Sequence, residues 1–378
     1  MQFSNVIGQE RLKNKLIEGV KTNRVHHAQL FLGDSGYGSL ALAMAYAQYL
    51  NCESPSDTDS CGQCPNCLKN YKLIHPDVHF SFPVVATKSS AKSDQQNFYA
   101  KWRELVQETA YPSYNEWILK IGKENKQGNI PMSEARNIIR KLTLKSHQGG
   151  YKVLIMWLPE YLGREGNVLL KVLEEPSPKT IFILVAEDES KILQTILSRC
   201  QIIRIPRIES EEIKESLIKG LDITEERAGQ CAALAEGSFR RAIEIFNAGD
   251  NHFYTAFTQW VRLAFMHDYS ALHLWAQQTA GTGRESTKNF LIYALGMFRE
   301  SILLGQDIEQ LSSLQGEELT WMRDKFAPAV SHEGVIKVVG EINETLYLIE
   351  RNVSLKVVLF DLSLHISKHL RKSEVSPT

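Results

Sequence analysis

Residues 167–200 constrain the fold most, because a helix, a strand and a second helix follow one another there in quick succession. Thr180–Ala186 is an unbroken run of β-branched and aromatic residues, which is typical of a strand buried on both faces. The leucines of NVLLKVL before it mark one side of a short helix that two prolines end. Ser190 is predicted to cap a helix over residues 191–197, and another apolar run follows at 201–205.

This alternation of helices and strands predicts an α/β domain with a parallel sheet and flanking helices. Further strands are predicted near residues 29–32, 79–82 and 152–156. We place the domain at residues 1–206, a small helical domain at 207–250 and an all-helical domain at 251–378. Within the last domain, one apolar helix stripe is predicted from five residues: Ile336, Val339, Ile342, Leu346 and Ile349.

A glycine-rich turn, GDSGYGSL, lies between the first predicted strand and an alanine-rich helix. This setting is typical of a phosphate-binding loop with the pattern G-x-x-x-x-G-K-[ST]. Gly33 and Gly38 match its glycines and Gly36 adds a third, but Ser39 replaces the lysine and Leu40 the hydroxyl residue. Phosphate charge and Mg²⁺ would therefore lack their protein partners. The turn is either an ordinary glycine turn or a degenerate phosphate loop, and we favour the second.

The strand predicted at 152–156 provides a second test of nucleotide chemistry. An NTPase of this architecture carries an acidic pair directly after that strand, whereas this chain has Trp157 and Leu158. Neither side chain can hold Mg²⁺ or polarise water. We therefore expect no ATP hydrolysis by this chain, while weak nucleotide binding stays open.

Four cysteines lie close together in NCESPSDTDSCGQCPNC, at Cys52, Cys61, Cys64 and Cys67. Two overlapping C-x-x-C turns and one further thiolate can complete a tetrahedral zinc site with no open coordination position. Such a closed site is structural. A redox-active dithiol or a chance grouping is the alternative.

Bulk properties narrow the class of protein. Lys and Arg number 43 against 44 Asp and Glu, and this balance argues against non-specific nucleic-acid binding as the main activity. No apolar run is long enough to span a bilayer, so we expect a cytoplasmic protein.

Residues 87–127 are polar and are predicted to be an insertion with one or two helices and a mobile segment at 88–96. Its aromatic residues either pack locally, which we favour, or stack on nucleic-acid bases: Trp102, Tyr111, Tyr114 and Trp117.

Taken together, the chain resembles the delta-prime family of subunits in the clamp loader of bacterial DNA polymerase III, which are AAA+ proteins. The resemblance extends over essentially the whole chain and is carried by VIGQERLKNKL, HHAQLFLGDSGYG, the four-cysteine insert, NVLLKVLEEPSPKT, TILSRCQ and NVSLKVVLFDL. It implies an AAA+ α/β domain with a zinc-binding insert, a helical lid domain and an all-α C-terminal collar domain for oligomerisation.

The resemblance also implies a function, which is to support ATP-dependent loading of the sliding clamp onto primed DNA. Arg199 of TILSRCQ would act in trans as an arginine finger on ATP bound to a neighbouring subunit. Arg240 of GSFRRA looks like the lid arginine with which active AAA+ proteins sense nucleotide. The implied partners are the clamp-loader ATPase subunits and the delta subunit, and indirectly the clamp and primed DNA. The chain would have no ATPase activity of its own within the polymerase III holoenzyme.

Other interpretations remain. Arg199 could form a surface salt bridge or a helix C-cap, and Arg240 could pair with an acidic neighbour. Two other functions are an autonomous AAA+ ATPase with an atypical phosphate loop and a zinc-dependent DNA-binding module.

Overall fold

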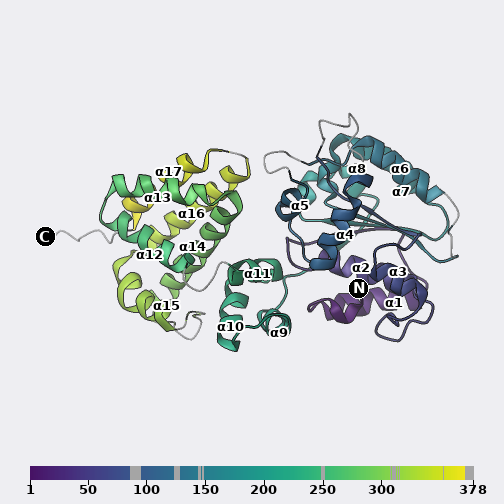
Figure 1. The fold of residues 1–378 in the computed structure, drawn as a ribbon, viewed down its shortest axis with the longest axis horizontal. Coiled ribbons are helices and arrows are strands. Elements are labelled where there is room, and N and C mark those ends of the chain that lie inside the picture. Colours follow the sequence, from purple (N-terminus) through teal and green to yellow (C-terminus); the bar gives the residue numbers. More distant parts are fainter. Residues whose placement is uncertain are drawn as a thin grey trace. The chain divides into compact units, whose positions relative to one another are not determined.

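The computed structural model describes residues 1–85, 95–122, 128–143, 149–247, 252–306, 316–351 and 353–370, together with residues 146, 308, 312 and 314. The chain divides into two compact units. Unit 1 contains residues 1–216 and 236–240, and unit 2 contains residues 217–235 and 241–378 (Figure 1).

A five-stranded parallel sheet forms the centre of unit 1, in the order β2-β3-β4-β1-β5. The strands are β1 (Ala28–Leu32), β2 (Val78–Ser81), β3 (Lys152–Trp157), β4 (Thr180–Ala186) and β5 (Gln201–Arg204). Leu30 pairs with Leu184 on one side and with Ile202 on the other, which fixes the register of the three strands. Every residue of β1, β3 and β4 is buried, so the unbroken apolar runs do indicate strands covered on both faces.

Helices cover both faces of this sheet (Figure 1). On one face, side chains from α6 (Met132–Thr143), the 3₁₀ helix η3 (Pro159–Leu169), α7 (Leu170–Glu174) and α8 (Gln194–Leu197) share a core with alternate strand residues. The other face carries α2 (Ser39–Leu50), and α1 (Glu10–Lys21) lies beside α2. All residues of α2 are buried, which explains why its sequence has no polar side.

One local prediction in this unit was wrong. Ser190 does not cap a helix over residues 191–197, because its N–H and its hydroxyl both donate to the side chain of Asp188. Asp188 instead caps a short 3₁₀ turn, η4 (Glu189–Lys191), and α8 begins only at Gln194. The side chain of Asp188, two residues before Ser190, accepts the backbone N–H of Ser190 and so caps the turn in its place.

The polar insertion does form two helices, α4 (Tyr99–Glu108) and α5 (Tyr114–Lys120), after a 3₁₀ turn, η2 (Gln95–Phe98). Trp102 and Trp117 are fully buried, so these two indoles pack in the core and are not available for stacking on bases. Of the segment predicted to be mobile, residues 88–94 lie outside the described residues.

The remaining elements are helical. Unit 1 also contains η1 (Phe3–Asn5) and α3 (Pro65–Tyr71), while α9 (Ser210–Gly220) and α11 (Phe239–Asn247) belong to both units. Unit 2 contains α10 (Glu225–Leu234), α12 (His252–Phe265), α13 (Tyr269–Gly281), α14 (Arg284–Gly305), α15 (Gly316–Trp321), η6 (Met322–Phe326), η7 (Ala327–Ala329), α16 (His332–Glu350) and α17 (Leu355–His369). None of the helices within the described ranges is long and apolar enough to cross a membrane.

The apolar stripe predicted on α16 is confirmed at Ile342 and Ile349, is half-buried at Val339 and Leu346, and is wrong at its first position. Val335, Val338, Ile342 and Ile349 are buried, whereas Ile336 is 56% exposed. The helix packs against α14 and α17, and it presents to them the side that begins with Val335. Apolar residues at both 335 and 336 left the sequence ambiguous, and the tertiary contacts decided between them.

Candidate functional site

The glycine-rich turn lies at the carboxyl end of β1 and leads directly into α2. Gly36 and Gly38 have φ angles of +83° and +93°, which residues with a β-carbon rarely adopt. Ser39 and Leu40 are the first residues of α2, and both are buried. The turn therefore keeps the backbone position of a phosphate loop but offers no lysine to a phosphate and no hydroxyl at position 40 to Mg²⁺.

The space over this loop is nearly filled. The remaining cavity has a volume of about 20 Å³, room for roughly one water molecule. It is lined by loop residues, by the end of β3 and β4, and by residues 110–112 of the insertion. Trp157, the last residue of β3, is buried and packs on Trp102 of the insertion with a ring-centroid separation of 5.1 Å. An indole thus ends β3, one residue beyond the predicted end of the strand, and Leu158 is the first residue after it.

Glu160 is the first acidic residue after β3, and its role is structural. Its Oε1 atom accepts hydrogen bonds from the backbone N–H groups of Glu187 at 2.5 Å and Asp188 at 2.8 Å. Burial raises the pKa of the Glu160 carboxyl above its ordinary value. The carboxyl therefore connects the segment that follows β3 to the two residues that follow β4.

Arg199 lies at the surface between α8 and the edge strand β5, and its side chain is 32% exposed. Its Nε atom donates to Oε1 of Glu174 at 2.7 Å, and a second guanidinium nitrogen contacts the same oxygen. The third nitrogen donates to the backbone carbonyl of Thr195 at 2.7 Å. The surface salt bridge considered as an alternative for Arg199 is therefore present in this chain.

Arg199 is far from the phosphate loop of its own chain. Gln201 of β5 pairs with Gln29 of β1, whereas the loop begins after Leu32, which pairs with Arg204. At about 3.3 Å per residue, the level of the loop is some 13 Å beyond Gln201 along the strand, and Arg199 precedes Gln201. The arginine thus lies at the amino end of β5 and the loop at the carboxyl end of the adjacent strand β1, at opposite ends of the parallel strands.

Arg240 is close to the loop, but it is already paired with an acidic residue. Its guanidinium lies 2.9 Å from the carboxylate of Glu116 in α5, and both side chains are mostly buried. The neighbouring Phe239 donates its backbone N–H to the carbonyl of Gly36 at 3.1 Å. Of the two interpretations of Arg240, the structure shows the ion pair.

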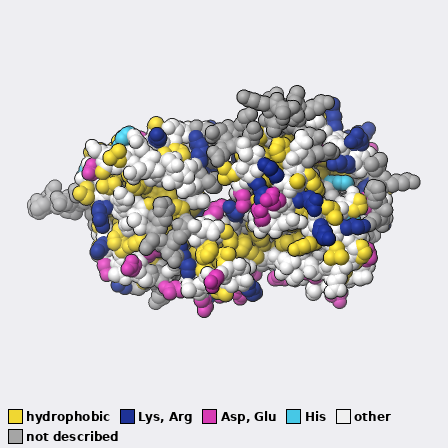
Figure 2. Space-filling model, in the orientation of Figure 1, with side chains coloured by type: hydrophobic (Ala, Val, Ile, Leu, Met, Phe, Trp, Pro, Cys, Tyr) yellow, Lys and Arg dark blue, Asp and Glu magenta, His cyan; other side chains and the backbone are white. Residues whose placement is uncertain are grey.

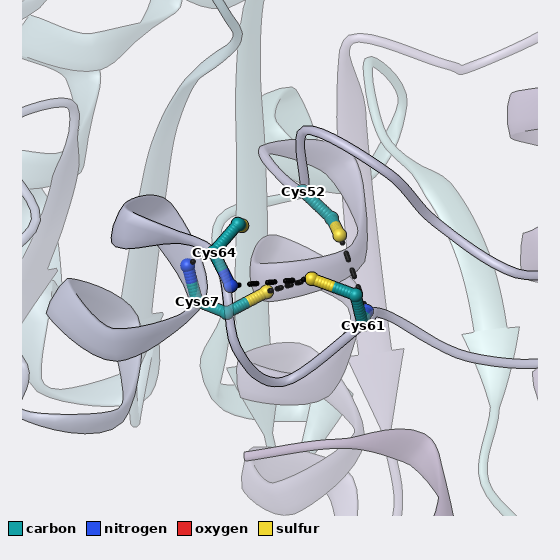
Figure 3. A group of neighbouring side chains, drawn as sticks. All are labelled: Cys52, Cys61, Cys64 and Cys67. Atoms are coloured by element: carbon teal, nitrogen blue, oxygen red, sulfur yellow. Dashed lines mark hydrogen bonds between the residues drawn. The ribbon is translucent and has the colours of Figure 1, made fainter.

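The four cysteines do come together (Figure 3). Cys52 follows the end of α2, Cys61 lies in the next loop, and Cys64 and Cys67 belong to the start of α3. Their sulfur atoms all lie within 4.8 Å of one another, and those of Cys61 and Cys67 are 3.9 Å apart. A tetrahedron with Zn–S bonds of about 2.3 Å has edges of about 3.8 Å, so the spacing fits a closed metal site.

Backbone N–H groups support this arrangement of sulfurs. Cys61, Cys64 and Cys67 donate theirs to the sulfurs of Cys52, Cys61 and Cys64 at 3.2–3.4 Å. The N–H of Cys64 is the largest contribution that lowers the pKa of the Cys61 thiol to about 6. Burial raises the pKa of the Cys52 and Cys67 thiols instead, so a metal ion would have to displace their protons when it binds the thiolates.

Comparison with known proteins gives the family. The family described as "DNA polymerase III, delta subunit" matches residues 8–209, more than half of the chain. The chain belongs to this family. It is a clamp-loader AAA+ protein, as the resemblance implied.

Three curated relatives show how far the similarity extends for this member of the DNA polymerase III delta-subunit family. The delta' subunit of Haemophilus influenzae is 30% identical over 53% of this chain and 48% of that protein. The delta' subunit of Escherichia coli is 25% identical over 63% and 59%, and the tau subunit of the same organism is 28% identical over 64% and 32%. These matches thus span from about a third to about three fifths of the relatives' own lengths.

Sequence reasoning missed three residues of this delta-subunit family member that the structure brings to the site. Glu174 pairs with Arg199, Glu116 pairs with Arg240, and Tyr111 covers Gly38. Tyr111 was noted only as one of several aromatic residues in the insertion. The two glutamates lie in charged helices, and no spacing connects either of them with its arginine.

Proposed function

We propose that this chain is a non-catalytic subunit of a DNA polymerase III clamp loader, which supplies Arg199 to ATP bound by a neighbouring subunit. In this role it supports ATP-dependent loading of the sliding clamp onto primed DNA. Its direct partners are the clamp-loader ATPase subunits and the delta subunit.

The position of Arg199 is the observation that supports this proposal most. The guanidinium is partly exposed near the amino end of β5, while the chain's own phosphate loop follows the carboxyl end of the neighbouring strand β1. Arg199 therefore cannot serve its own loop. A guanidinium that enters from outside neutralises charge on the transferred phosphoryl group, and arginines supplied in this way contribute about 10³–10⁵ in rate.

The other parts of the chain can be assigned roles that fit a subunit which supplies Arg199 but does not itself hydrolyse ATP. We assign residues 207–250 to a helical lid domain and residues 251–378 to a collar domain that joins the other subunits. The four cysteines would hold a structural zinc ion. In that role the metal stabilises the turn around Cys61 and α3 and takes no part in phosphoryl transfer.

The test uses a clamp loader reconstituted with Arg199→Ala. We expect the complex to assemble while the ATP turnover stimulated by clamp and DNA falls. Arg204→Ala is the matched control, since Arg204 is an exposed arginine at the other end of β5, the strand that follows Arg199, and it also pairs with a glutamate, Glu189. Turnover equal to that of the wild-type complex would refute the proposal for Arg199.

The two other functions have distinct signatures. An autonomous ATPase would hydrolyse ATP as an isolated chain and lose that activity in Arg240→Ala. A DNA-binding module would bind DNA tightly without the clamp, with a steep dependence on salt. Figure 2 offers the latter little support, because Lys and Arg side chains on the face it shows are interspersed with acidic and apolar ones.

A further inference from the structure

The insertion fills the place that a nucleotide phosphate would need. Gly38 lies so close to the ring of Tyr111 that a β-carbon on the glycine would be 3.1 Å from the tyrosine Cε1 atom. Tyr111 is only 6% exposed, and its hydroxyl accepts the backbone N–H of Ile7 at 2.8 Å. The N-terminus of α2, which could otherwise attract an anion, is therefore covered by an aromatic ring.

The segment that carries Tyr111 is firmly anchored. Tyr111 lies between α4 and α5, and each of these helices buries a tryptophan. Trp102 stacks on Phe82 with a centroid separation of 4.5 Å, and Trp117 donates its Nε1 hydrogen to the carbonyl of Pro83 at 2.6 Å. Withdrawal of Tyr111 would disturb these buried contacts, so the ring is a fixed part of the loop's surroundings.

The same insertion supplies the negative charge that Arg240 requires. The carboxylate of Glu116 lies 2.9 Å from the Arg240 guanidinium. Next to the arginine, the ring of Phe239 contacts that of Tyr111 at 5.1 Å between centroids. Ser238 donates its hydroxyl hydrogen to the carbonyl of Ser35 at 2.8 Å. Residues 236–240 are thus attached to the loop and to the insertion by polar and aromatic contacts together.

We propose that the insertion is a built-in substitute for nucleotide. Tyr111 occupies the space over the phosphate loop, and the Glu116 carboxylate takes the place of a phosphate as the anionic partner of Arg240. Residues 236–240 are then held against the loop permanently, and ATP or ADP neither binds there nor changes that attachment. This inference does not depend on the role of Arg199, because it concerns only contacts within unit 1.

Hydrogen exchange measured on the full-length chain tests the proposal, with peptides that cover residues 236–240 and β4. We expect millimolar MgATP to change neither the exchange nor the melting temperature of the wild-type protein. Glu116→Gln removes the carboxylate charge, and exchange at residues 236–240 should accelerate about five- to thirtyfold while exchange at β4 stays unchanged.

Two further variants make the test specific. Glu108→Gln is the matched control, since Glu108 belongs to the same insertion but pairs with Lys120, and it should leave residues 236–240 unchanged. The double variant Glu116→Gln with Arg240→Gln should exchange no faster than the faster single variant, because both changes break the same ion pair between Glu116 and Arg240. Protection of the wild type by MgATP, an unchanged Glu116→Gln variant, or an equal acceleration at β4 would each overturn the proposal.

Discussion

Two guanidinium nitrogens of Arg199 share one carboxylate oxygen of Glu174. Glu174 ends α7, before β4 in the sequence, whereas Arg199 comes after β4. Both side chains are substantially exposed. An exposed ion pair of this kind contributes only about 0–1 kcal/mol to stability. The pair is therefore weak enough to open when a stronger anion, such as a phosphate of a neighbouring subunit, approaches the arginine.

Removing the Glu174 charge should leave Arg199 usable. We expect Glu174→Gln to change the free energy of unfolding by less than about 1 kcal/mol. In a reconstituted clamp loader, ATP turnover should equal or exceed that of the wild type, by at most about fivefold, because the arginine no longer has to leave a partner. Turnover as low as that of Arg199→Ala would show instead that Glu174 must orient the arginine.

The cysteine cluster predicts a metal-dependent part of the fold. We expect one zinc ion per chain, and we expect Cys61→Ser to lower both the zinc content and the melting temperature, since metal binding contributes directly to folding. Elemental analysis and thermal unfolding with and without a chelator measure the two effects. Cys200→Ser is the control, because Cys200 lies outside the cluster. An unchanged zinc content in Cys61→Ser would contradict the assignment.

Trp102 connects the insertion to the sheet, and its loss should be costly. Its ring is fully buried between Phe82 and Trp157. We expect Trp102→Ala to reduce the free energy of unfolding by about 3–5 kcal/mol, the usual cost of deleting a large buried aromatic side chain. Urea denaturation gives the value. Tyr71→Ala removes an aromatic ring that is 68% exposed and should have almost no effect.

His79 in β2 should make the fold sensitive to mild acid. Burial lowers the pKa of His79 to about 4, and the positive charge of Lys141 acts in the same direction. Between the unfolded pKa of about 6.5 and the folded value, the unfolded chain binds the proton more readily, so stability falls as the pH decreases through this window. The contribution is at most about 1.4 kcal/mol per pH unit.

The comparison of His79→Gln with the wild type isolates this contribution from that of the carboxyl groups. Denaturant unfolding at several pH values between 7 and 4 should show a shallower loss of stability in the variant. The exposed His332 serves as the control, and His332→Gln should retain the slope of the wild type. Equal slopes in wild type and His79→Gln would refute the prediction.

Several features of this chain were readable from local sequence because local chemistry produces them. The unbroken apolar run at Thr180–Ala186 can be satisfied only where both faces of a strand are covered, and β4 is buried throughout. The spacing of Cys61, Cys64 and Cys67 places three thiols within one turn of chain, and the structure gathers them with Cys52. The absence of a lysine at Ser39 likewise needs no tertiary structure to be interpreted.

What covers each of these features was decided only by the tertiary structure. Tyr111 over Gly38 and Glu116 beside Arg240 bring together segments separated by long stretches of chain, as does Glu174 beside Arg199. The choice of Val335 over Ile336 as a buried position on α16 is of the same kind. A sequence pattern specifies which side chains need a partner, but which partner they obtain depends on how separate elements pack, because contact energies act between residues that are neighbours in space.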